Sequence, residues 1–139
     1  MDIHEQHLDE RSDTRLTEEF RRSIVDGQMA LPFCMKCLRF SFYPRPFCPH
    51  CWSSSIEMKP VSGEGVVWSY TIVHFAHGGT SGWHARLPYV VALIELAENV
   101  RMMANIVDCD LELLQVGVAV EVDYRQFDGV SLPVFVSRT

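Results

Sequence analysis

The chain has 139 residues, 47% of them apolar, which is enough for one ordinary hydrophobic core or for a small core joined to a metal-stabilised module. No apolar run approaches the roughly 18 residues that a membrane-spanning helix needs, so we expect no membrane-spanning helix. The formal net charge of −6 argues against a nucleic-acid-binding protein, because such proteins usually carry a basic surface.

The first twelve residues are polar and acidic, and we expect residues 1–12 to form a disordered leader. They lack the basic and apolar regions of a secretory signal. We therefore expect a cytoplasmic protein. In such a reducing compartment, paired cysteines are more often metal ligands than disulfides.

Residues 13–28 predict an N-terminal helix that ends near Gly27. Leu16, Phe20 and Ile24 recur every four residues and give this helix one apolar face. A single short helix is only marginally stable alone, so the face must be covered. It could pack on the protein's own body or dock on a partner, and the sequence leaves both possibilities open.

Residues 29–55 contain two Cys-x-x-Cys pairs, Cys34 with Cys37 and Cys48 with Cys51. Each pair lets two thiolates reach one ion from a tight turn, and two such turns enclose a tetrahedral site of four sulfurs. Prolines in this stretch forbid a helix, so we expect a rubredoxin-like zinc ribbon. Four thiolates leave no open coordination position, which predicts a structural site. We expect one zinc ion, with iron as the alternative, since both accept four sulfurs.

The cysteine module differs in charge from the rest of the chain. Between residues 27 and 56 there is no aspartate or glutamate, whereas Lys36, Arg39 and Arg45 give this stretch a formal charge of +3. Three cations are few for a nucleic-acid track. A small phosphorylated ligand or an acidic protein surface fits them at least as well.

Residues 56–139 predict a barrel. One helical turn is expected at residues 110–117. Otherwise β-branched and aromatic residues dominate, which is typical of strands. The strand-like segments are 65–75, 88–98, 100–108, 118–128 and 130–136. This number of strands favours a small closed barrel of the oligonucleotide/oligosaccharide-binding (OB) type. The fold class is therefore mainly β: an N-terminal helix, a ribbon and a C-terminal OB barrel.

The loop at residues 76–87 interrupts the strands and contains three glycines, Trp83 and two histidines. Loops of this length are often functional or mobile, and His77 is our candidate if one of the histidines contributes to a site. Cys109 stands alone after an apolar strand and is most simply a small buried hydrophobe. No nucleophile and base are recognisable together, so we expect no catalytic residues in this chain.

Several motifs occur in a recognisable order over roughly residues 14–136. They are the four cysteines with YPRPFCP between them, a Gly-x-Gly turn into WSYT, the strand PYVVALIEL, and LPVF near the end. This order resembles the zinc-ribbon/OB-fold family of accessory subunits associated with thiolase-superfamily and acyl-CoA enzymes. The family usually has glycine after the second cysteine, where this chain has Leu38. That departure predicts a less tight first knuckle, with no ligand lost.

The resemblance implies a non-catalytic accessory or scaffold subunit that bridges or clamps the catalytic subunits of a thiolase-superfamily acyltransferase or acyl-CoA-processing complex. Relatives accompany thiolase/HMG-CoA synthase assemblies, steroid aldolases, aromatic-degradation thiolases and phloroglucinol acetyltransferases. The partner would supply the nucleophile. Candidates for contact with the partner, or with coenzyme A held by it, are Lys36, Arg39, Phe42, Tyr43, Arg45, His77 and Trp83. The alternative is a single-strand nucleic-acid-binding module, because ribbons and OB barrels also serve that role.

Overall fold

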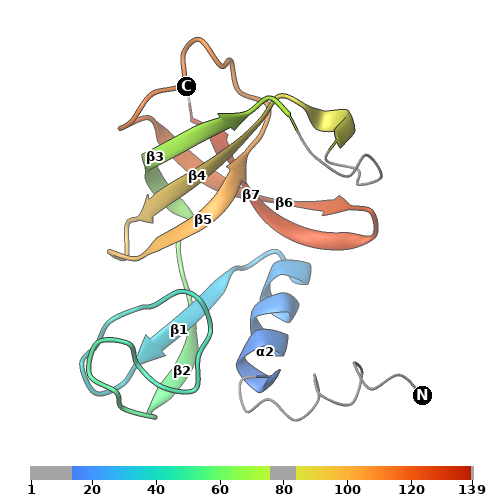
Figure 1. Ribbon diagram of the computed structural model, residues 1–139. Coiled ribbons are helices and arrows are strands. Elements are labelled where there is room, and N and C mark those ends of the chain that lie inside the picture. The colour runs from blue at the N-terminus through green and yellow to red at the C-terminus, as the bar shows by residue number, and fades with distance from the viewer. Residues whose placement is uncertain (1–13, 76–83, 139) are drawn as a thin grey trace. The chain divides into compact units, whose positions relative to one another are not determined.

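The computed structural model describes residues 14–75 and 84–138, and these divide into an N-terminal unit up to Val61 and a C-terminal unit from Ser62 (Figure 1). The first unit contains a two-stranded sheet and the second a closed barrel. The predicted leader lies outside the described residues, as do His77 and Trp83. No helix in the described part is long and apolar enough to span a membrane.

The N-terminal helix α2 (Thr14–Val25) packs its apolar face on its own unit. Leu16 and Ile24 are buried, and Leu16 belongs to the same apolar cluster as the buried cysteines. The ring of Phe20 lies 5.8 Å from the ring of Phe42 in the ribbon. Of the two possibilities that the sequence left open, packing on the protein's own body is therefore the one observed.

The helix ends at a left-handed glycine, as its sequence predicts. Gly27 has φ +74°, a conformation that costs a glycine little. Its N–H donates to the carbonyl of Ile24 (3.1 Å), and the N–H of Gln28 donates to the carbonyl of Ser23 (3.0 Å). These two bonds form a Schellman motif, which satisfies carbonyls that the last turn leaves free. The hydroxyl of Ser23 then accepts from the N–H of Ala30, which ties the helix end to the first strand.

The ribbon consists of strands β1 (Ala30–Cys34) and β2 (Ile56–Pro60), which pair antiparallel with Cys34 opposite Ile56. From the sequence we placed residues 56–60 in the barrel domain. The structure places them in the N-terminal unit, because β2 pairs with β1 and Ile56 is buried among the cysteines. The boundary between the units therefore falls between Val61 and Ser62 rather than between residues 55 and 56.

The C-terminal unit is a closed five-stranded barrel in the order β3-β4-β5-β7-β6 (Figure 1). Neighbouring strands are antiparallel except β5 and β7, which pair in parallel. This confirms the predicted OB barrel. Its strands are β3 (Glu64–Val73), β4 (Tyr89–Leu96), β5 (Arg101–Ile106), β6 (Ala119–Phe127) and β7 (Val130–Ser137).

Successive side chains of a strand point to opposite faces, so a regular barrel strand turns every second side chain toward the interior. β4 shows this most regularly: Val90, Ala92, Ile94 and Leu96 are all buried, and the residues between them are half-buried. Val120, Val134 and Phe135, from the strands that complete the barrel, are fully buried as well. These apolar residues form the core of the barrel.

Two turn predictions have different outcomes. The hairpin between β4 and β5 turns at Asn99, whose φ is +62°, as expected for the Glu98-Asn99 pair. The helical turn expected at residues 110–117 is wrong: the structure has a hydrogen-bonded turn there, in which the N–H of Leu113 donates to the carbonyl of Asp110 (3.1 Å). A short 3-10 helix, η1 (His84–Arg86), instead lies in the stretch expected to be a loop.

The chain enters the barrel through Gly63, which is buried and has φ +78°. The carbonyl of Gly63 accepts from the N–H of Val122 at 2.8 Å. A Cβ at this position would overlap the Cγ1 methyl of Val122. Both the backbone conformation and the space therefore require glycine here.

Gly63→Ala should lower the free energy of unfolding by about 3 kcal/mol, since the left-handed conformation costs a non-glycine residue about 1–2 kcal/mol and overpacking adds a similar amount. Gly129→Ala is the matched control: Gly129 has φ +80°, but its Cβ would meet nothing within 4 Å. The control should lose only the part of the free energy of unfolding that comes from the left-handed backbone conformation. Urea denaturation of both variants checks this, and equal losses would contradict the role given to the Val122 contact.

Candidate metal centre and exposed ribbon surface

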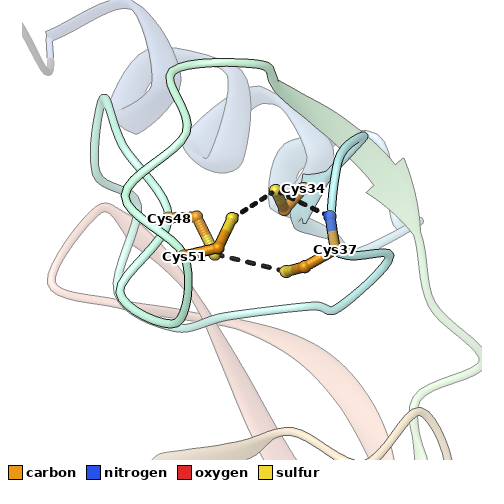
Figure 2. Close-up of side chains that lie close together, drawn as sticks. All are labelled: Cys34, Cys37, Cys48 and Cys51. Atoms are coloured by element: carbon orange, nitrogen blue, oxygen red, sulfur yellow. Dashed lines mark hydrogen bonds between the residues drawn. The ribbon is translucent and has the colours of Figure 1, made fainter.

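Four cysteine sulfurs converge between the two knuckles of the ribbon (Figure 2). Their Sγ atoms all lie within 4.8 Å of one another, with Cys34 to Cys51 and Cys37 to Cys48 each at 3.6 Å. A disulfide would bring two sulfurs to about 2.05 Å, so these are free thiols. Four sulfurs placed tetrahedrally at about 2.3 Å from a zinc ion would lie about 3.8 Å apart. The donor set therefore fits one tetrahedral metal ion.

The two knuckles have the same backbone geometry. The N–H of Leu38 donates to the carbonyl of Cys34, and the N–H of Trp52 donates to the carbonyl of Cys48, both at 2.9 Å. Leu38 and Trp52 are both left-handed, with φ +61° and +64°. The expectation that Leu38 makes the first knuckle less tight is therefore wrong, because leucine adopts the conformation that glycine would.

Backbone N–H groups point at the sulfurs of Cys34 and Cys48. The N–H of Cys37 lies 3.4 Å from the Sγ of Cys34, and the N–H of His50 lies 3.3 Å from the Sγ of Cys48. The Cys37 N–H is the main cause that lowers the pKa of Cys34 to about 6. Burial, followed by the neighbouring thiols, raises the pKa of Cys37 to about 12. Holding all four sulfurs as thiolates therefore requires a cation among them.

The cysteine cluster is also the core of the N-terminal unit. Cys34 and Cys48 are each only 1% exposed, and they form one apolar cluster with Leu16 of α2 and Ile56 of β2. Cys37 and Cys51 are half-buried against this cluster. A metal here would hold the helix, both strands and both knuckles together, which is the role of a structural ion.

The three cations that the sequence singled out lie on the surface of the ribbon. Lys36, Arg39 and Arg45 are exposed. Among the residues that the structure describes, none of the three takes part in an ion pair. Their positive charges therefore remain available to a ligand or a partner.

The two predicted aromatic contacts differ in exposure. Tyr43 is 54% exposed, whereas Phe42 is half-buried. The ring of Phe42 lies 4.2 Å from that of Tyr43 and 5.8 Å from that of Phe20 in α2. Phe42 thus helps to pack the helix on the ribbon, and Tyr43 is the more accessible of the pair.

Four large apolar residues that we had not selected are exposed on the ribbon: Met35, Leu38, Phe47 and Trp52. We call them the knuckle surface. Trp52 is 73% exposed, and its ring stacks on that of Phe47 with 5.1 Å between centroids and 17° between planes. The sequence holds a signal that could have singled out two of them, because Leu38 and Trp52 each follow the second cysteine of a Cys-x-x-Cys pair.

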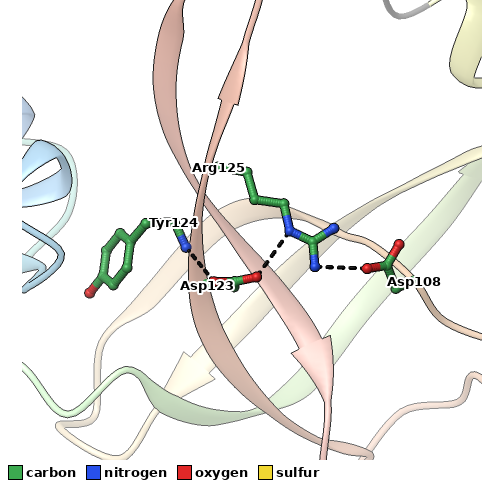
Figure 3. Close-up of polar contacts among 4 residues, drawn as sticks. All are labelled: Asp108, Asp123, Tyr124 and Arg125. Carbon is green, nitrogen blue, oxygen red and sulfur yellow. Dashed lines mark hydrogen bonds and ion pairs between the residues drawn. The ribbon is translucent and has the colours of Figure 1, made fainter.

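The barrel has its own cavity, of about 330 Å³, beside Cys109. Burial, and after it the carboxylates of Asp110 and Asp108, raises the pKa of Cys109. The thiol is therefore protonated at neutral pH and is a poor nucleophile. Arg125 also lines this cavity, but Asp108 (2.7 Å) and Asp123 (3.0 Å) hold its guanidinium (Figure 3). The cavity thus offers neither an activated thiol nor an unpaired Arg125.

A four-thiol ribbon followed by an OB barrel defines the class of this protein, and comparison with known proteins gives the family. Residues 58–125 match the model of the ChsH2 C-terminal OB-fold domain. A DUF35 domain-containing scaffold protein of Methanocaldococcus jannaschii is 36% identical over 70% of this chain and 71% of its own length. The chain belongs to the family of DUF35 domain-containing scaffold proteins.

Other relatives are named as parts of enzymes. A probable enoyl-CoA hydratase alpha subunit of Thermomonospora curvata is 33% identical over 78% of this chain, which spans only 33% of that subunit. The benzoylsuccinyl-CoA thiolase subunit BbsA of Geobacter metallireducens is 33% identical over 52% of this chain and 46% of BbsA. A chain of the solved Ltp2-ChsH2(DUF35) aldolase superposes with a TM-score of 0.77 at 27% identity. That superposition covers 93% of this chain and 97% of the aldolase chain.

Cys48→Ser should abolish stoichiometric metal binding and unfold the ribbon, because folding and metal binding are coupled in sites of this kind. Cys109→Ser is the matched control, since Cys109 lies outside the four-sulfur cluster. Elemental analysis should find one metal ion per chain in the wild type and in the control, and a large loss in Cys48→Ser. A Cys48→Ser protein that keeps both its metal and its fold would refute the site.

Proposed function

We propose that this chain is a non-catalytic accessory subunit of a thiolase-superfamily acyltransferase or acyl-CoA-processing complex, in which it bridges or clamps the catalytic subunits. The observation that carries the proposal is the superposition on a chain of the Ltp2-ChsH2(DUF35) aldolase over nearly the full length of both chains. The scaffold-protein relatives and the thiolase subunit BbsA support it independently. The partner would be a thiolase-like subunit, in a hetero-oligomer.

Catalysis in such a complex belongs to the partner. Four of the five cysteines lie in the metal centre, where their sulfurs are ligands rather than nucleophiles. The fifth, Cys109, has a raised pKa beside two carboxylates. None of these thiols is an activated nucleophile, which favours a non-catalytic role for this chain.

The metal that we propose is one structural zinc ion, with iron as the less favoured alternative. The four-sulfur donor set and its burial support zinc, which adopts tetrahedral four-thiolate coordination in ribbons. Free thiols also suit a reducing compartment, and we propose the cytoplasm as the location.

Contact with the partner is proposed for the ribbon and for the loop at residues 76–87. On the ribbon, the exposure of Lys36, Arg39, Arg45 and Tyr43 supports this role. Coenzyme A phosphates held by the partner are a further candidate ligand for the three cations. His77 and Trp83 stay predictions for the loop.

The wild-type chain, co-expressed with the thiolase-superfamily subunit of its own host, should co-elute with it in size-exclusion chromatography as a hetero-oligomer. Arg39→Glu should weaken this association about tenfold, because it places a negative charge where we expect carboxylates of the partner. Isothermal titration at low and moderate salt measures both affinities.

Arg22→Glu, an exposed charge reversal on α2, is the control and should leave the affinity nearly unchanged. If the wild-type chain elutes alone in the presence of the catalytic subunit, the proposed function is wrong.

A further inference from the structure

Leu38 and Trp52 occupy backbone conformations that large side chains rarely adopt. Their φ values of +61° and +64° lie in the left-handed region, which strains the backbone of a non-glycine residue. Burial of the side chains does not offset this strain, since Leu38 is 66% and Trp52 73% exposed. Glycine would satisfy the same turns without strain.

Both residues stand at the same place in the two knuckles. Each follows the second cysteine of its pair, and each donates its N–H to the carbonyl of the first cysteine. The four cysteines belong to one sulfur cluster, so the two knuckles share one rigid base once a metal is bound. Leu38 and Trp52 are therefore held in place before any partner arrives, which lowers the entropic cost of binding.

The surroundings of Trp52 favour a role in contact. Its ring is held by stacking on Phe47, which is itself 38% exposed. Tryptophan is among the residues that contribute most to protein–protein binding, and its large surface loses little entropy when it is held in this way. Met35, 42% exposed, adds a flexible apolar side chain beside the first knuckle.

The charges of the ribbon indicate what covers the knuckle surface. Exposed Lys36, Arg39 and Arg45 accompany the apolar residues, and no carboxylate occurs between residues 27 and 56. Strand β2 adds one carboxylate, Glu57, and one cation, Lys59, so the excess of positive charge on the ribbon is unchanged. A partner surface that is complementary to the knuckle surface and its cations therefore has apolar pockets with carboxylates near them. Single-stranded nucleic acid fits less well, because leucine and methionine offer no stacking face and three cations are few.

We propose that Leu38 and Trp52 are paired anchors that insert into apolar pockets, bordered by carboxylates, on the thiolase-superfamily catalytic subunit. The identity of this partner rests on the function proposed above. The anchors explain why large apolar side chains stand at positions where glycine would be more stable. Strain of this kind persists at sites where binding needs it.

The test substitutes glycine at each anchor. Leu38→Gly and Trp52→Gly should keep one metal ion per chain and unfold at the same or a higher temperature, because the backbone strain is relieved. Each should nevertheless lose at least tenfold in affinity for the purified catalytic subunit of the same host, measured by isothermal titration. Trp52→Phe should stay within a few-fold of the wild type, since it keeps an aromatic anchor.

Leu113→Ser is the control for general loss of exposed apolar surface, because Leu113 is 70% exposed in the barrel unit, and it should bind like the wild type. A wild-type chain that binds while both glycine variants bind equally well would overturn the anchors and leave the accessory function standing. A wild-type chain that does not bind overturns both.

Loss of metal or of the folded ribbon in the glycine variants would show a structural role for these residues and overturn the proposal. The proposal is also overturned if the glycine variants still bind the catalytic subunit but lose self-association, measured by light scattering. It is likewise overturned if they lose only the binding of a labelled single-stranded oligonucleotide.

Discussion

Four cysteine sulfurs within 4.8 Å of one another are the constraint on which the N-terminal unit depends. Its two strands have five residues each, and an isolated two-stranded sheet is marginal in water. A unit of this size buries too little apolar surface to be stable without a metal or disulfides, and the thiols are free. The helix packs through Leu16 on the same cluster. A metal bound by these sulfurs would therefore hold together the core around which the helix, the strands and the knuckles are arranged.

The barrel depends on a different kind of interaction. Its strands close on one another, which leaves no open sheet edge, and buried aliphatic residues fill its interior. In the barrel, Arg125 is paired with two carboxylates, and burial, followed by two neighbouring carboxylates, raises the pKa of Cys109. The exposed cations Lys36, Arg39 and Arg45 and the two proposed anchors lie in the ribbon. This division suits a subunit whose contribution to a complex is contact rather than chemistry.

The sequence was most informative where one chemical requirement dominates. Two Cys-x-x-Cys pairs can enclose a metal in few ways, and a short run rich in β-branched residues, such as residues 88–98, predicts a strand. The sequence was least informative where the pairing between strands decides to which unit a segment belongs. The sequence of residues 56–60 does not distinguish a ribbon strand from a barrel strand. Only the pairing of these residues with β1 assigns them to the ribbon. The positive φ of Trp52 was also not evident, because hydrogen bonding across the knuckle, rather than local preference, imposes it.

The central claim is that the metal-stabilised ribbon is the surface through which this chain holds a catalytic subunit. A structure of the complex with the thiolase-superfamily subunit, at a resolution that shows side chains, tests it most directly. We predict that the side chains of Leu38 and Trp52, which are 66% and 73% exposed here, become buried against that subunit. A complex in which the barrel makes all the contacts and both side chains stay exposed to solvent would contradict the account.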